Sequence, residues 1–459
     1  MKARFDIVQR NVAFAFVGIS AIVLLLLFPY SPLQDFPQWI YQGFVFNSLV
    51  SGHDVGHFFL KSYPVPYATA QILISASLLL FSPMVTSKLI VVGYFVLSFW
   101  VSRRLVRRFD LDPKIAWPLL ISIFVLNSPF WNGYLGYQLG LIVFATYLSL
   151  SDEARTDSRV LVAFSVLAFF CHGMTYVAFM VAAGACAIAR RRIIGPLIGV
   201  TPSIALVIWY VACKTPSPPP DSLPSLGFVG FIGYKAYSLL KLGPYQNFVI
   251  RGIGDAGRLA STPLILGILA NIAFGLGLSM RCVSATKWRE WPTLLRIPEL
   301  LCAIVLLAFW IVLTPIALKI VNPGERLLYP AVLAIATRAF RVDRVSSMDK
   351  IAHVGRLLLS SAFVAGFFLS AVGLISSTLA YRRSSFDTIS ERLDWGDSYG
   401  LGALSGERLS QTLFVHRLIQ FDRLMKETES AWRTGATLNI PLEFDTALVG
   451  QSNPAPPNP

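Results

Sequence analysis

The chain has 459 residues, of which 55% are hydrophobic and only 14% are charged, and its mean hydropathy is +0.61. A soluble domain carries roughly 25% charged residues, so this composition excludes an ordinary soluble fold. The formal net charge of +14 does not indicate nucleic-acid binding, because the basic residues form short clusters between apolar runs instead of one continuous polar surface. The composition therefore predicts one large membrane domain followed by a polar tail.

Eleven apolar runs are candidates for membrane-spanning helices, since a span needs about 20 apolar residues. They are residues 12–30, 84–102, 115–130, 134–150, 160–172, 174–189, 193–213, 262–280, 298–321, 326–340 and 357–379. A twelfth run, residues 67–81, is apolar but ambiguous. The pattern predicts an all-α polytopic membrane protein.

The basic clusters decide the orientation, because loops that stay in the cytoplasm are enriched in Lys and Arg. If the N-terminus is cytoplasmic and residues 67–81 do not span, every later cluster is cytoplasmic. These clusters lie at residues 103–108, 190–192, 281–296 and 338–356. We therefore predict eleven crossings with the N-terminus inside and the C-terminus exported, and we expect residues 67–81 to form a re-entrant or surface-lying helix on the exported side.

This topology divides the chain into a transmembrane domain, residues 1–380, and an exported helical tail, residues 381–450. Two exported loops are large, at residues 31–83 and 214–261. The second is rich in Pro and Gly, which break regular structure, so we expect an irregular loop. The last residues, 451–459, are rich in Pro and Asn and are expected to be disordered.

Charged residues are rare in this chain, so a charge placed at the end of a span is informative. Asp35 lies just past the outer end of the first predicted helix, beside Pro37 and Trp39. A carboxylate that is only partly hydrated is a stronger base. The alternative is an ordinary loop aspartate that begins a turn or caps a short helix from Pro37.

The sequence around Asp35 resembles the GT-C superfamily of membrane glycosyltransferases. Relatives carry an acidic residue in the first exported loop, often as Asp-x-Pro-x-His, and this chain reads Asp35-Phe-Pro37-Gln-Trp39, which lacks the His. The Pro-rich stretch from Tyr63 to Tyr67 and the basic boundary at residues 103–108 are also similar to the family pattern. The resemblance covers residues 12–340 and implies a GT-C-like bundle of about eleven transmembrane helices with exported loop helices.

Two further positions are similar to family elements that lie on the exported side. The turn at His172-Gly173 resembles a family turn near the donor phosphate, and the segment from Asn322 to Pro330 resembles an element near the lipid-phosphate site. The resemblance implies that Arg326 and His172 bind the donor phosphate, with the dipole of the helix that starts there adding attraction. The alternatives are a hydrogen-bonded histidine at a helix break and a Glu325–Arg326 boundary pair.

Aromatic and amide side chains in the exported turns suit stacking on sugars and hydrogen bonding to them. The predicted sugar or acceptor contacts are Trp39, Trp131, Asn132, Tyr137 and Gln138. The alternative is that the aromatic residues only populate the membrane interface. The second acid that many relatives tie to a metal is missing between Asp112 and Asp152. We therefore predict no metal site and no cofactor, and the weak motif His53-Asp54-Val-Gly-His57 does not change this prediction.

The resemblance implies transfer of a sugar from a polyprenyl-phosphate donor to an envelope glycan, lipid or protein, with Asp35 as the base and the anomeric centre inverted. The expected partners are the lipid-linked sugar, membrane lipid and other envelope-assembly proteins, and the expected location is the bacterial inner membrane. A transporter or flippase is the second alternative; that class tends to place charges at mid-membrane and to show internal repeats, whereas most spanning runs here lack central charges and no repeated halves are found. A non-catalytic partner in envelope polysaccharide assembly stays open as a third alternative.

Overall fold

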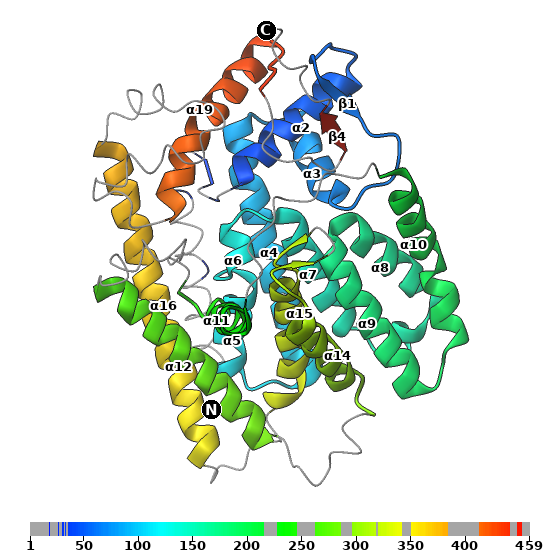
Figure 1. Cartoon of the computed structure of the whole chain (residues 1–459), viewed down its shortest axis with the longest axis vertical. Helices are drawn as coiled ribbons and strands as arrows, with labels where there is room; N and C mark the ends of the chain where they lie inside the picture. Colours follow the sequence, from blue (N-terminus) through cyan, green and yellow to red (C-terminus); the bar gives the residue numbers. More distant parts are fainter. Residues whose placement is uncertain are drawn as a thin grey trace, which may run out of the picture.

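The structure is a computed structural model. It describes residues 18, 26, 30, 31, 33, 35–214, 227–245, 262–285, 296–317, 320–341, 350–383, 413–440 and 448–451. Almost all of this is helical, with two short strand pairs (Figure 1). Of the first predicted span, residues 12–30, only Gly18, Leu26 and Tyr30 are described, so that prediction lies outside the described residues.

The first half of the chain forms a run of helices that begins with α2 and the loop after it. The elements are α2 (Phe36–Val50), β1 (Phe58–Leu60), α3 (Ala68–Leu78), α4 (Pro83–Phe109), α5 (Pro113–Phe124), α6 (Ser128–Trp131), α7 (Leu135–Leu148), η1 (Ala154–Thr156), α8 (Ser158–Cys171), α9 (Gly173–Arg190) and α10 (Ile194–Cys213). Proline stands in the first turn of α2, α4, α5 and α6, where its missing N–H costs no hydrogen bond. Asp112, Asn127, Asp157 and His172 accept an N–H at the start of the helix that follows them.

The second half returns against the same bundle. Its elements are α11 (Phe228–Leu240), α12 (Thr262–Ala285), α14 (Pro298–Val312), β2 (Ile316–Ala317), β3 (Ile320–Val321), α15 (Pro323–Ala339), α16 (Lys350–Arg383), α19 (Leu413–Thr434) and β4 (Val449–Gln451). Helix α7 packs against α4, α8, α9 and α15, and most of its side chains are buried. The core therefore lies around α7, α9 and α15, while α12 and α16 pack on one another at one side (Figure 1).

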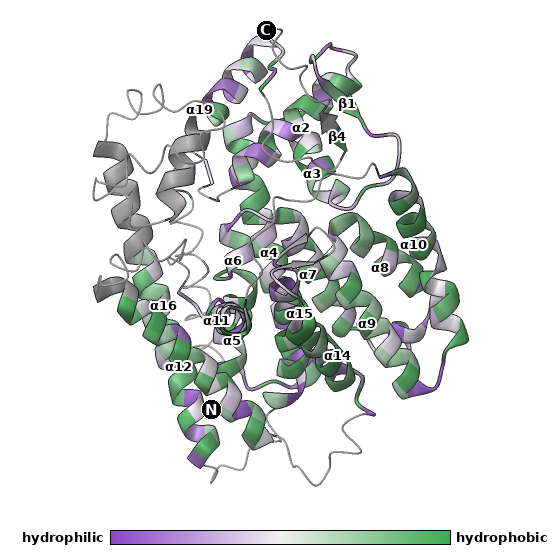
Figure 2. Ribbon diagram, viewed as in Figure 1, coloured by the Kyte–Doolittle hydropathy of each residue, from purple (hydrophilic) through white to green (hydrophobic). Residues whose placement is uncertain are grey.

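Six segments among the described residues are long and apolar enough to cross a bilayer. They are Pro83–Phe109, Pro113–Trp131, Gly173–Arg190, Ile194–Cys213, Ile265–Val283 and Lys350–Ala371. On α10, Ile194, Leu197 and Ile208 are between 60% and 77% exposed, which a water-facing helix would not tolerate over its length. Figure 2 shows hydrophobic residues along such helices and hydrophilic residues towards their ends. The protein is thus an all-α, multi-pass membrane protein.

Five other apolar helices are shorter, with 10–17 residues each. They are Ala68–Leu78, Leu135–Leu148, Ser158–Cys171, Phe228–Leu240 and Pro298–Val312. At 1.5 Å per residue, the 11 residues of α3 extend about 16 Å, roughly half of a hydrocarbon core. The other four have 13 to 15 residues, so the six longer segments are the ones whose length and composition suit a crossing.

Ion pairs gather arginines at one end of the bundle, which we call the basic end. Asp152 bonds to Arg155 and Arg190 and lies 3.5 Å from Arg108. Arg155 also pairs with the buried Glu299 at the start of α14. Just beyond α4, the backbone bridge of residue 111 to residue 341 joins the end of α15 to the same end of the bundle. The loops that the sequence predicts to be basic therefore meet in space.

Two elements differ from the sequence predictions. The loop at residues 214–261 was expected to be irregular, but its residues 228–240 form α11, because apolar side chains outweigh the two interior glycines and Lys235 donates to the carbonyls of Trp310 and Leu313. The predicted span 298–321 ends at Val312, since Pro315 disfavours helix in the residue before it. A short hairpin, β2–β3, follows instead.

Candidate functional site

The end of the bundle opposite the basic end, which we call the site end, holds the start of α2. Asp35 precedes this helix and is 8% exposed, and its backbone N–H donates to the carbonyl of Asn132 at 3.1 Å. Gly133 has φ +79°, and a Cβ there would lie 2.7 Å from the amide nitrogen of Phe36. The turn between α6 and α7 therefore fits directly against the residue that carries the predicted catalytic carboxylate.

His172 lies in the turn between α8 and α9 and is 2% exposed. Its Nδ1 accepts the backbone N–H of Met174 at 3.0 Å, so the ring caps α9. Its Nε2 lies 3.3 Å from a guanidinium nitrogen of Arg326. Burial, and then the charge of Arg326, lower the pKa of His172 well below its usual range. The imidazole is therefore neutral near pH 7.

Arg326 lies in the first turn of α15, which begins after Asn322 at φ +50° and Pro323. The carbonyl of Arg326 accepts the hydroxyl of Tyr137 at 2.7 Å. The guanidinium stacks over the ring of Tyr134, with its Cζ 4.8 Å from the ring centroid. These contacts hold the guanidinium against His172, and a planar guanidinium held in this way is suited to bidentate binding of phosphate.

The proton positions at this contact are informative. Because Nδ1 of His172 accepts an N–H, the neutral ring carries its proton on Nε2, which faces Arg326. Nε2–H and the guanidinium N–H groups are then all donors, and none can accept from the other. An anionic oxygen beside both groups would accept from both. The pair is therefore chemically suited to an anion.

Glu325, the neighbour of Arg326, is directed elsewhere. Its carboxylate pairs with Lys241 at 2.9 Å, and both side chains are largely buried. The hydroxyl of Tyr329 donates to the carbonyl of Lys241, which ties the end of α11 to α15. Within the described residues, no carboxylate forms an ion pair with Arg326. The alternative of a Glu325–Arg326 pair thus does not apply, and the positive charge of Arg326 stays available to a ligand.

Aromatic rings enclose the His172–Arg326 pair. The rings of Tyr67 and Tyr137 meet the imidazole edge-on, at centroid distances of 4.8 and 5.2 Å. The ring of Trp39, one turn after Asp35, has its centroid 6.5 Å from that of the Tyr67 ring. Tyr67 has φ +75°, which is rare for a bulky residue and is typical of strained functional sites. Low-polarity walls strengthen any charge interaction inside them.

Tyr134 connects Asp35 with this pair. Burial raises the pKa of Tyr134, and the charge of Asp35 adds to that rise while the charge of Arg326 opposes it. Both charges are therefore close enough to act on the same hydroxyl. Contacts link the same residues: the amide of Asp35 bonds to Asn132, two residues before Tyr134, and the guanidinium that stacks on Tyr134 is the one beside His172.

Of the other predicted sugar contacts, Asn132 lies next to the start of α2, with Trp131 directly before it in the chain, whereas Gln138 lies within the bundle. Asn132 supplies its carbonyl to Asp35, and its side-chain Nδ2 donates to the hydroxyl of Ser128 at 3.3 Å. Trp131 packs edge-on against Phe130. Gln138 is buried in a polar network: its Oε1 accepts from Tyr94 at 2.6 Å, and its Nε2 donates to Asn127 at 2.6 Å. The amide of Gln138 is therefore engaged within the bundle, and we leave it out of the proposed site.

Metal binding has no support in the described part of the chain, where no group of three or more His, Cys, Asp or Glu side chains could hold an ion. His53, Asp54 and His57 lie in the loop after α2, and Asp54 accepts the amide of Gly56 at 2.8 Å. That bond is the usual local turn contact of an aspartate. The weak histidine motif thus belongs to the turn.

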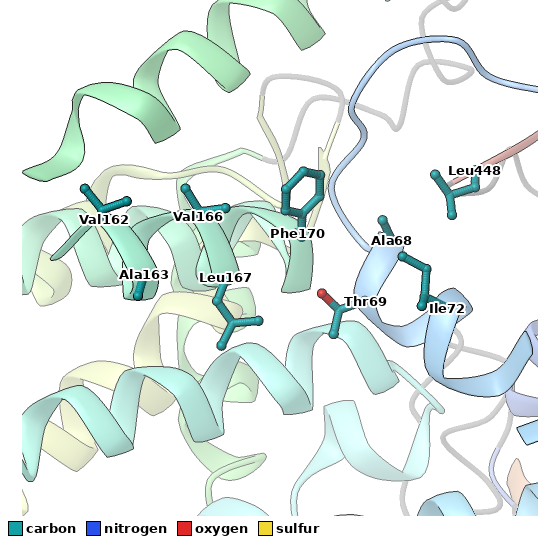
Figure 3. A pocket seen from close by; sticks show the side chains of 9 residues that line it. All are labelled: Ala68, Thr69, Ile72, Val162, Ala163, Val166, Leu167, Phe170 and Leu448. Carbon is teal, nitrogen blue, oxygen red and sulfur yellow. The ribbon is translucent and has the colours of Figure 1, made fainter. Parts of the chain in front are cut away.

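An apolar groove starts beside the aromatic enclosure (Figure 3). It has a volume of about 460 Å³ and is lined by Ala68, Thr69, Ile72, Val162, Ala163, Val166, Leu167, Phe170 and Leu448. Ala68 directly follows Tyr67, and Phe170 is two residues before His172. From Phe170 to Val162 the groove follows α8 for eight residues, about 12 Å, away from the site end.

Three residues at this candidate site escaped the sequence analysis as individual candidates. Tyr67 and Tyr134 stand inside motifs that the sequence singles out, and their position next to Pro66 and Gly133 was the available signal. Lys241 gave no signal, because its partner Glu325 is 84 residues away.

Comparison of the chain with protein-family models, with curated proteins and with solved structures finds no match. The function therefore has to be argued from the site itself.

Proposed function

We propose that the protein is a GT-C-type membrane glycosyltransferase that takes a sugar from a polyprenyl-phosphate donor at the site end. The observation that carries this proposal is the contact of Arg326 with Nε2 of His172, two donors at 3.3 Å inside aromatic walls. A phosphate offers several oxygens to both donors at once. Lys241 already neutralises the adjacent Glu325, so an incoming anion meets uncompensated positive charge.

The groove beside the anion site favours a lipid-linked phosphate over a soluble one. All but one of its lining side chains are hydrocarbon or aromatic, and the exception is Thr69. Its volume falls within the range of about 300–1,000 Å³ that is usual for small-molecule sites. Ile72 and Leu167 are 51% and 44% exposed, so the groove is open at this side. A charged head group and a hydrocarbon chain would thus find adjoining sites.

In the proposed reaction, Asp35 acts as the general base. The acceptor hydroxyl gives its proton to the carboxylate of Asp35, and its oxygen forms a bond to the anomeric carbon. The bond from that carbon to the donor phosphate breaks, and the phosphate leaves with the electron pair, stabilised by Arg326 and the Nε2–H of His172. Trp39 and Tyr67 offer ring faces for the sugar. A single displacement inverts the anomeric centre.

The finer topology is part of the proposal. Eleven crossings place α2, the α8–α9 turn and the start of α15 on the exported face and the basic end in the cytoplasm. The contact of α19 with α2 supports this arrangement, because it places the C-terminal tail beside the first loop. A polyprenyl carrier presents its sugar on the exported face of the bacterial inner membrane, and the acceptor is an envelope glycan, lipid or protein.

The transfer reaction is tested with purified protein in lipid nanodiscs and a radiolabelled polyprenyl-phosphate sugar. We expect Asp35→Asn to lower the transfer rate by about 10²- to 10⁴-fold, because a neutral amide cannot accept the proton. Binding of the donor should persist, since Asn keeps the size of the side chain. Asp54→Asn, in an exposed turn, is the control and should transfer at the wild-type rate. Full activity of folded Asp35→Asn would reject the base.

A further inference from the structure

The last described segment of the chain returns to the first exported loop. Strand β4 pairs antiparallel with β1, with Val449 opposite Leu60. The carbonyl of Leu448 accepts the amide of Lys61 at 2.9 Å, and the amide of Leu448 donates to Oε1 of Gln71 at 2.7 Å. Gln71 belongs to α3 and is fully buried. The backbone carbonyl of Leu448 is therefore fixed by the loop between α2 and α3, and its amide is fixed by α3 itself.

A second set of bonds holds the C-terminal segment to α2. The hydroxyl of Tyr41 lies 3.1 Å from the carbonyl oxygens of Leu438 and Ile440, and it accepts the amide of Ile440 at 2.7 Å. The indole of Trp432 donates to the carbonyl of Leu78 at 2.9 Å. Residues nearly 400 positions apart thus form one layer at the site end (Figure 1).

This layer also forms part of the groove. Figure 3 shows Leu448 facing the groove next to Ala68 and Ile72 of α3, with Phe170 of α8 beyond them. The side chain of Leu448 is the one lining group that comes from the C-terminal segment. The bonds of the Leu448 backbone to Lys61 and Gln71 determine the position of this side chain in the groove. A change in the C-terminal segment would therefore change the width of the groove.

We propose that the C-terminal segment, described at residues 413–440 and 448–451, is a working part of the lipid site, in which Leu448 forms one side of the groove against the hydrocarbon chain of the polyprenyl phosphate. This inference rests on the proposed function, which supplies the occupant. The occupant is a single hydrocarbon chain joined to a phosphate, because the groove adjoins the His172–Arg326 pair through Tyr67. Tyr41 and Gln71 are positioning residues that hold this side of the groove in place.

The test compares two probes that share the phosphate and differ in the chain. Binding of a long-chain polyprenyl phosphate and of methyl phosphate, which has no chain to enter the groove, is measured on purified protein in nanodiscs. Leu448→Trp fills the groove, so the dissociation constant of the long-chain probe should rise about tenfold while that of the short probe changes less than about twofold. Leu80→Trp, at a side chain that is 76% exposed and outside the groove, is the matched control.

Tyr41→Phe provides a second variant that keeps the shape of the core. It removes the hydroxyl that bonds to Leu438 and Ile440. The dissociation constant of the long-chain probe should therefore rise several-fold, while that of the short probe should change little. Tyr176→Phe, which loses a bond to Ser203 elsewhere, should change neither. Equal weakening of both probes by Tyr41→Phe would assign this residue to general stability and would overturn its positioning role.

A chain-labelled photoreactive polyprenyl phosphate separates failure of the inference from failure of the proposed function. Crosslinks mapped to the peptides around Leu448 and Phe170 support the groove assignment. Crosslinks confined to other helices, with binding that still requires Arg326, overturn the role of the C-terminal segment and leave the proposed function standing. If no polyprenyl phosphate binds in an Arg326-dependent manner, both proposals fail.

Discussion

At the scale of single residues, the neutral state of His172 carries much of the chemistry. A cation there would repel Arg326 at 3.3 Å and would lose the bond from Met174, because a protonated Nδ1 cannot accept an N–H. The residue is buried among aromatic rings that offer little solvation. The side chain therefore acts as a fixed donor through Nε2 and as a helix cap through Nδ1.

This neutral state predicts a dependence of stability on pH. The pKa of His172 is lower in the folded protein than its value of about 6.5 in the unfolded chain. When the pH falls below about 6.5, the unfolded chain therefore binds a proton at His172, whereas the folded protein keeps the imidazole neutral. Stability is complete above that value and falls as the pH drops, by at most about 1.4 kcal/mol per pH unit for one group. From about pH 7 to about pH 5, the melting temperature of the wild type should fall further than that of His172→Gln. Equal slopes would contradict this assignment.

The rarity of charge explains which site residues the sequence could predict. Asp35, His172 and Arg326 stand out because each is polar at the end of an apolar run, and the structure places His172 against Arg326 and links Asp35 to them through the α6–α7 turn. Gln138 looked equally suitable, but its partners come from α4 and from the turn before α6, which no local pattern shows. The pairing of Lys241 with Glu325 was hidden for the same reason.

At the scale of elements, the α6–α7 turn positions the start of α2. Gly133 adopts φ +79°, and its Cα faces the backbone of Asp35 and Phe36 without space for a methyl group. Any side chain there must push the turn away from Asp35 and must also adopt a backbone conformation that only glycine takes easily. The position of the carboxylate is therefore determined by a neighbouring turn.

Gly133→Ala should accordingly destabilise the site end. The strained backbone costs on the order of 1 kcal/mol or more, and the Cβ contact at 2.7 Å adds to it. We expect a lower melting temperature and transfer reduced by at least tenfold. Gly93→Ala on α4 is the control, since a Cβ there meets nothing within 4 Å. Unchanged activity of Gly133→Ala would show that this turn does not position Asp35.

The sequence predicted helices better than it predicted their ends. Apolar runs correctly located α4, α7, α8, α9 and α10, whose limits lie within a few residues of the expected ranges, except for the basic end of α4. Helix α11 was missed because its glycines suggest a loop, whereas its contacts with α12 and with the carbonyls at the end of α14 come from distant sequence. Tertiary contacts thus decided what local propensity did not.

At the scale of the whole molecule, charge separates the two ends. The basic end gathers Arg108, Arg155 and Arg190 around Asp152, while the site end holds the anion site and the groove. Loops rich in arginine stay in the cytoplasm, so this asymmetry predicts the orientation in the membrane. The proposed donor reaches the protein on the opposite face.

Cysteine labelling in intact cells tests this orientation. In a background with Cys213 and the other native cysteines replaced by Ser, Ser62→Cys should react with a membrane-impermeant maleimide without permeabilisation. Arg191→Cys, in the exposed turn between α9 and α10, should react only after the cytoplasmic membrane is permeabilised. Reaction of Arg191→Cys in intact cells would place the basic end outside and would remove the basis of the proposed topology.

The anion site at Arg326 and His172 is the claim on which the chemistry depends, and direct binding tests it. The dissociation constant of a polyprenyl phosphate is measured on purified wild type, on Arg326→Gln and on the exposed control Arg159→Gln. Losing a charge-assisted bond costs about 1.5–3 kcal/mol, so Arg326→Gln should bind about 10- to 100-fold more weakly while Arg159→Gln matches the wild type. Equal affinity of Arg326→Gln and the wild type would contradict the account.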